Sequence, residues 1–178
     1  TLRDDLKRLQ SSIVIENSDL QTVRSKSNLN SKTYHDRVAI MRSKLQLGTT
    51  PGNPILVEAW NAAQEQLEKV NDDIGEMNSL SSRVAADASM SAYLLDATRA
   101  SFGISGAVDE DHQQLEVLED EVNRTVVLIE RLLTELSDDI RRQTNYVANE
   151  RNQLNTLALA IKNGEFFGPS LASTAYNV

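Results

Sequence analysis

The residues of this chain with the greatest chemical potential are its two histidines. His112 closes the sequence Asp109-x-x-His112, whose spacing matches the Glu-x-x-His of di-iron bundles. Such bundles need two motifs of this kind and two further carboxylates that face inward, whereas this chain has one, with Asp in place of Glu. The other histidine, His35, lies in a different segment of the sequence. We therefore predict no metal site and no cofactor.

The remaining chemically suggestive motifs are incomplete. The adjacent acids Asp72–Asp73 and Asp138–Asp139 do not face each other on a helix, so we interpret both pairs as solvated surface. The stretch GTTPGNP at residues 48–54 lacks the Gly-Lys-Ser/Thr of a phosphate loop. Because the chain contains no cysteine, thiolate sites and disulfides are excluded. We predict no catalytic residue and no enzymatic activity.

The overall charge narrows the classes of partner. The 178 residues carry a formal net charge of −8, whereas nucleic acids and anionic membranes require basic surfaces. No apolar run of about 18 residues is present, so no direct membrane insertion is expected. We predict a protein partner or self-association, no nucleic acid, and no small-molecule ligand. The sequence leaves localisation open between the cytoplasm and the periplasm or cell envelope.

The helix breakers show which elements must position these residues. Glycine and proline cluster at 48–54, 103–106 and 164–169, and both residues mark helix ends. We predict helices at about 1–47, 54–100 and 107–163, followed by a tail or linker at 164–178. In the first cluster, Gly48 is the expected C-cap, Asn53 the N-cap and Pro54 the first helical residue.

Apolar residues recur at alternating steps of four and three, which is typical of coiled-coil packing. The clearest ladder lies in the second segment: Leu56, Trp60, Ala63, Leu67, Val70, Ile74, Met77, Ser81, Val84, Ala88, Ser91, Leu95 and Thr98. The ladders of the other segments include polar residues at Glu16, Gln143 and Arg151. The polar stretch Ser25–Lys32 weakens the first ladder, and we expect a continuous but weakened helix there.

Short connections between these helices favour antiparallel neighbours. We predict an all-α fold, an elongated antiparallel three-helix bundle with up-down-up topology, in which residues 1–163 form one domain. The first segment has nine Lys/Arg against five Asp/Glu, while the other two are acidic. We therefore expect the basic helix to form ion pairs with its acidic neighbours.

Two groups of apolar residues are more than one seam needs, where a seam is the packed interface between neighbouring helices. Val127, Leu128 and Leu133 point away from the main stripe of the third segment. They either widen a seam that contacts both neighbouring helices, or form a face for a dimer or an external partner. Phe166 and Phe167 follow the last helix, and they either cap the end of the bundle or dock a partner.

These features favour a structural or interaction module, an elongated helical spacer or scaffold segment that is able to dimerise. The chain begins at Thr1 instead of Met, and we expect it to be part of a longer protein. The alternative is an extracytoplasmic helical-bundle sensor or secretion-apparatus subunit. In that case Ser25–Lys32 would be the notch that binds a small ligand or a partner protein.

Overall fold

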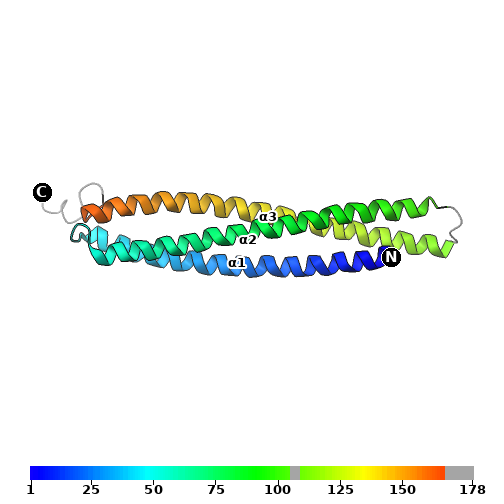
Figure 1. Ribbon diagram of the computed structural model, residues 1–178, viewed down its shortest axis with the longest axis horizontal. Helices are drawn as coiled ribbons and strands as arrows, with labels where there is room; N and C mark the ends of the chain where they lie inside the picture. Colours follow the sequence, from blue (N-terminus) through cyan, green and yellow to red (C-terminus); the bar gives the residue numbers. More distant parts are fainter. Residues whose placement is uncertain (105–108, 167–178) are drawn as a thin grey trace. The chain divides into compact units, whose positions relative to one another are not determined.

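The chain folds into three α-helices, as predicted (Figure 1). The computed structural model describes residues 1–104 and 109–166, and for residues 109 and 110 it describes the backbone alone. The helices are α1 (Leu2–Leu47), α2 (Pro54–Phe102) and α3 (Asp109–Asn163), and the described residues contain no strand. The all-α, three-helix fold class is therefore confirmed. Residues 107 and 108, at the predicted start of the third helix, lie outside the described part.

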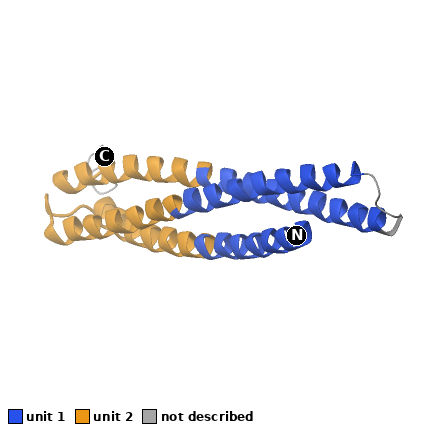
Figure 2. Cartoon of the chain, turned by 45° about the vertical axis from the view of Figure 1, so that its right-hand side comes forward, with its two compact units in different colours: residues 1–23, 76–140 blue, residues 24–75, 141–178 orange. Residues whose placement is uncertain are grey.

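The helices build two compact units (Figure 2). Unit 1 consists of residues 1–23 and 76–140, and unit 2 of residues 24–75 and 141–178. Each helix contributes one segment to each unit and remains helical across the unit boundary. Thr1 belongs to unit 1 and Asn163 to unit 2, which is the division that an up-down-up order of helices requires.

Unit 1 has one apolar core to which all three helices contribute. Its buried members are Leu6, Leu9, Ile13, Leu20, Val23, Met77, Leu80, Val84, Leu94, Leu118, Val122, Ile129, Leu132 and Leu136. All but Leu80 and Leu94 lie on the predicted ladders. These two are buried where the prediction placed their neighbours Ser81 and Leu95, which are half-buried. Fully burying an aliphatic side chain of this size stabilises a fold by about 1.5–3 kcal/mol. The seams between the helices are therefore what holds unit 1 together.

Unit 2 has its own buried residues on the same three helices. They are Tyr34, Val38, Met41, Leu45, Leu56, Ala63, Leu67, Val70, Ile74, Val147, Leu154, Leu157, Ala160 and Ile161. The prediction was wrong at Arg151 and Ala158, which are exposed. Leu157 is buried instead of its neighbour Ala158, so the ladder of α3 runs one residue earlier here than the predicted one.

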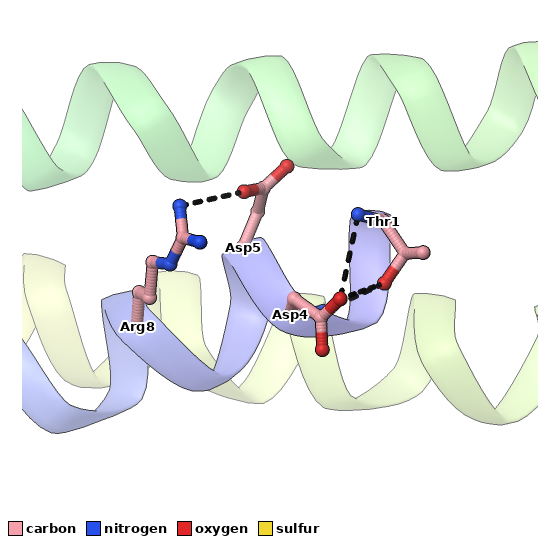
Figure 3. A network of polar contacts seen from close by, with 4 residues as sticks. All are labelled: Thr1, Asp4, Asp5 and Arg8. Atoms are coloured by element: carbon pink, nitrogen blue, oxygen red, sulfur yellow. Dashed lines mark hydrogen bonds and ion pairs between the residues drawn. The ribbon is translucent and has the colours of Figure 1, made fainter.

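The first turn of α1 is capped by its own side chains (Figure 3). The Thr1 hydroxyl accepts a hydrogen bond from the Asp4 backbone N–H at 3.2 Å and donates one to Asp4 Oδ2 at 2.6 Å. The first of these bonds satisfies a backbone N–H that a helix N-terminus otherwise leaves unpaired. The hydrogen bond from Thr1 lowers the pKa of Asp4. Asp5, in the same first turn, forms an ion pair with Arg8 at 3.7 Å.

The GTTPGNP stretch forms the connection between α1 and α2, with the predicted caps in place. Gly48 follows the last residue of α1 with φ +82°, a conformation that side chains disfavour. Asn53 Oδ1 accepts a hydrogen bond from the Ile55 backbone N–H at 3.0 Å, which is the bond that an N-cap residue makes. Pro54 is the first residue of α2.

This connection also closes the end of α3, which the sequence did not suggest. The Thr49 backbone N–H donates to the Gly164 carbonyl, and the Gly52 N–H donates to the Ile161 carbonyl, both at 2.8 Å. The last carbonyls of a helix have no partner within the helix. The loop between α1 and α2 therefore serves as a backbone cap for α3 within unit 2.

The polar stretch Ser25–Lys32 is helical along its whole length. Ser27 is buried at a position where the ladder would hold an apolar residue, and Asn30 is half-buried. Small polar side chains thus continue the seam, and the helix is not broken.

Candidate functional site

Four polar side chains come together between α1 and α3 in unit 2. The Tyr34 hydroxyl donates to Glu150 Oε2 at 2.8 Å. One residue along α1, His35 Nε2 lies 2.8 Å from the Tyr146 hydroxyl. The rings of Tyr34 and Tyr146 meet edge to face, with centroids 6.5 Å apart, a favoured aromatic arrangement. The four side chains therefore form two parallel interhelical contacts.

The environment keeps both tyrosine hydroxyls protonated. Burial raises the pKa of Tyr34 further above its usual range, and the hydrogen bond to Glu150 acts in the same direction. Burial also raises the pKa of Tyr146 to about 12, with the negative charge of Glu150 as the next cause. Acid–base catalysis needs a pKa close to the working pH. These hydroxyls are therefore suited to donating hydrogen bonds and not to transferring protons.

A second polar group surrounds Asp73 in unit 2, where α1 meets α2. The Asn30 amide donates to Asp73 Oδ2 at 2.8 Å, and Lys26 Nζ lies 3.6 Å from Asp73 Oδ1. Asp73 has no exposed surface. A carboxylate without solvent must be compensated by such partners, so this group fixes α1 against α2.

The buried aspartates correct the prediction that both acidic pairs are solvated surface. Asp73 and Asp139 are buried, while Asp72 is exposed and Asp138 is half-buried. Neighbouring residues on a helix point about 100° apart, so one member of each pair faces the seam. The sequence spacing could have indicated that Asp73 faces the seam, because Asp73 follows the ladder residue Val70 by three positions.

Two carboxyl groups meet between α1 and α2 of unit 1. Glu16 is buried, as its ladder position predicted, and Asp87 is half-buried. Beside them, Arg83 forms an ion pair with Asp19 at 2.9 Å. The sequence identified Glu16 as a polar ladder residue but gave no sign that Asp87 would face it.

Ion pairs and polar contacts also link the helices within each unit. The Trp60 indole N–H donates to the Leu154 carbonyl of α3 at 2.7 Å, so this predicted core residue also carries a polar contact. As expected, Lys26–Asp73 has its cation on α1. Further pairs have theirs on α2 or α3: Arg83–Asp19, Arg99–Glu119 and Arg151–Glu68.

The predicted partner face divides into two parts. Val127 is 62% exposed and Leu128 is 50% exposed, so both are accessible on α3. Leu133 is partly buried and packs against the core of unit 1, which is the wide-seam alternative. The role of Val127 and Leu128 as a dimer or partner face stays a prediction.

The other candidate residues are less informative. Phe166 is half-buried after the end of α3, and Phe167 lies outside the described residues, so the choice between cap and docking group stays open. The His112 ring meets Phe102 edge-on, with centroids 6.0 Å apart. Among the side chains that the structure describes, in residues 1–104 and 111–166, no group of three or more His, Asp or Glu is placed to hold a metal ion.

Two open surface hollows occur in unit 2. One is lined by polar and charged residues of α2: Asn61, Gln64, Glu65, Glu68, Lys69 and Asp72. The other is lined by Asn149, Asn152, Gln153 and Thr156 of α3. Ligand sites are generally concave and largely apolar, and neither hollow has that character.

Within the described part of the chain, none of the helices combines the length and the apolar character that crossing a membrane requires. No protein-family model matches the sequence, and comparison with curated proteins and with solved structures also yields no match.

Proposed function

We propose that this chain is a non-enzymatic structural module, a helical spacer or scaffold segment whose partner is another protein. The observation that carries the proposal is that the polar side chains contact neighbouring helices. Tyr34, Tyr146 and Trp60 each contact a neighbouring helix, and Asp73 does the same. The groups best suited to bind or transform a ligand thus connect helices.

The continuity of the helices supports the same proposal. Each helix passes from one unit into the other without a break in its hydrogen-bonded backbone. A helix transmits position along its axis because every backbone group in its interior is paired. A spacer requires elements of this kind, whereas a hinged sensor requires a loop or a break between its parts.

The spacer proposal can be tested by measuring a distance along α1. The absence of native cysteine allows spin labels to be attached at Ser18→Cys and Ser43→Cys, both exposed on α1. A continuous helix with a rise of 1.5 Å per residue places these positions roughly 37 Å apart. We expect one narrow distance distribution near that value by pulsed electron paramagnetic resonance.

The same labelled protein in concentrated urea is the control, and it must give a broad distribution. A broad or two-peaked distribution in native buffer would mean that α1 bends or melts between the two labels. The chain could then not hold its neighbours at a fixed separation, and the spacer proposal would fail.

A further inference from the structure

Glu16 on α1 and Asp87 on α2 each bring a buried carboxyl oxygen without a hydrogen-bond partner into unit 1. Glu16 is 5% exposed. Glu16 Oε2 and Asp87 Oδ2 are both shielded from solvent, and neither has a hydrogen-bond donor among the described residues. The Asp87 carboxyl is a hydrogen-bonding neighbour of the Glu16 carboxyl.

The surrounding charges do not neutralise this pair. Besides Asp87, two charged residues act on Glu16: Asp19 on α1, which is negative, and Arg83 on α2. Arg83 is already paired with Asp19 at 2.9 Å. The third helix faces this core with apolar residues such as Val122 and Ile129, and its charges beside Ile129, Glu130 and Arg131, are exposed.

Two ionised carboxylates cannot share such a site at low cost. Burial penalises each charge, and the two charges repel each other. A single added proton removes both penalties, because a neutral carboxyl group can donate a hydrogen bond to the carboxylate opposite. Such a bond would give the unpaired oxygens of Glu16 and Asp87 the partner that they lack.

We propose that Glu16 and Asp87 form a buried proton-binding site in which two carboxyl groups share one proton, and that loss of this proton loosens α1 from α2 in unit 1. This site makes the stability of unit 1 depend on pH near neutrality. Unit 2 contains neither residue, so its stability does not depend on this proton.

The direction of the response follows from proton linkage. Burial raises the pKa of Glu16 to about 7 from an ordinary value of 4.5, with the charge of Asp87 as the second cause and Arg83 opposing. The folded chain therefore binds more protons than the unfolded chain between these two values. The stabilisation is complete below pH 4.5 and is lost as the pH rises through about 7.

The site can be tested on the full chain in two ways. Carbon-detected nuclear magnetic resonance of the side-chain carboxyl groups should show Glu16 titrating close to neutrality. Hydrogen exchange, corrected for the intrinsic dependence of exchange on pH, should show the α1 amides of unit 1 losing protection as the pH rises past 7. We expect a loss of at least about tenfold, the change that one pKa unit represents.

Two variants separate proton binding from a general effect of charge. Glu16→Gln keeps a neutral hydrogen-bond donor in the seam, so its unit 1 amides should keep their protection at raised pH. Glu130→Gln removes one exposed negative charge from the same unit, and it should retain the pH response of the original chain.

Three results would overturn the proposal. Glu16 could titrate near its ordinary pKa in the folded chain, which would mean that no proton is shared. The Glu16→Gln chain could lose protection in the same way as the original. Finally, added Ca²⁺ or Mg²⁺ at raised pH could restore protection to the original chain but not to Glu16→Gln, which would make the occupant a cation.

Discussion

At the scale of single residues, Gly164 shows how a missing side chain determines packing. Its φ is +83°, and a Cβ at this position would lie 2.4 Å from the Thr49 carbonyl oxygen. The same loop donates two backbone hydrogen bonds to the end of α3. A side chain at Gly164 would therefore strain its own backbone and push away the loop that caps the helix.

We predict that Gly164→Ala lowers the free energy of unfolding by about 2–4 kcal/mol, from backbone strain and overpacking together. Chemical denaturation followed by circular dichroism would measure this loss. Gly75→Ala is the matched control, because Gly75 is helical and has open space around its missing side chain. Alanine there should raise stability by about 0.5–1 kcal/mol. Equal effects of the two substitutions would contradict the proposed cap.

At the scale of the helix, the seam between α1 and α2 distinguishes two adjacent aspartates. Asp73 is buried against Asn30 and Lys26, while Asp72 faces outward. Removing a buried carboxylate leaves its partners without compensation, whereas an exposed carboxylate is solvated by water. The orientation of the helix alone gives these identical residues different energetic roles.

We predict that Asp73→Ala destabilises the chain by about 2–4 kcal/mol, while Asp72→Ala changes stability by less than about 0.5 kcal/mol. The two variants change the net charge equally, so their difference isolates burial. Urea denaturation curves of both would measure it. Similar midpoints for the two variants would mean that the Asn30 and Lys26 contacts do not stabilise the seam.

The helices themselves could be predicted because the relevant signals are local. Gly48, Asn53 and Pro54 act through their own backbone geometry, so the bounds of the first connection follow from residue type. The ladder of α2 was right at most of its positions because alternating steps of four and three keep one face inward. It was wrong where Leu80 and Leu94 are buried in place of their neighbours Ser81 and Leu95. On α3 beyond Val147 the ladder was right at Leu154 and Ile161 and wrong at Arg151 and Ala158, which are exposed.

The polar contacts were much harder to predict because they depend on two helices at once. Glu16 stood out as a polar residue on an apolar ladder, but its partner Asp87 depends on the axial alignment of α1 with α2. The hydrogen bond from Tyr34 to Glu150 likewise joins residues that are 116 positions apart. A single sequence gives periodicity along each helix, and it contains no direct measure of the register between helices.

At the scale of the whole molecule, the negative charge is distributed very unevenly. Unit 1 contains seven Lys/Arg and 18 Asp/Glu, a balance of −11, while unit 2 contains 11 and eight, a balance of +3. The net charge of −8 is therefore the sum of a strongly negative unit 1, whose charges repel one another, and a unit 2 that is close to neutral. Self-repulsion destabilises a compact state, so the two units should respond differently to salt.

We predict that added NaCl stabilises unit 1 more than unit 2. Screening shortens the range of repulsion from about 30 Å at 0.01 M to about 10 Å at 0.1 M, and unit 1 has far more repulsion to lose. Its ion pairs, such as Arg99–Glu119, are also weakened, but exposed pairs contribute only about 0–1 kcal/mol each. Hydrogen exchange at fixed pH should therefore show protection rising several-fold in unit 1 and changing little in unit 2.

Choline chloride is the control salt, because a screening effect should not depend on the identity of the cation. Neutralising two exposed acids of unit 1, with Glu116→Gln and Asp120→Asn, should reproduce part of the stabilisation at low salt and reduce the response to added salt. An equal response of both units would mean that the local charge balance does not limit the stability of unit 1. Because the shared proton of Glu16 and Asp87 also lowers the negative charge of that unit, salt and acid should act on unit 1 in the same direction.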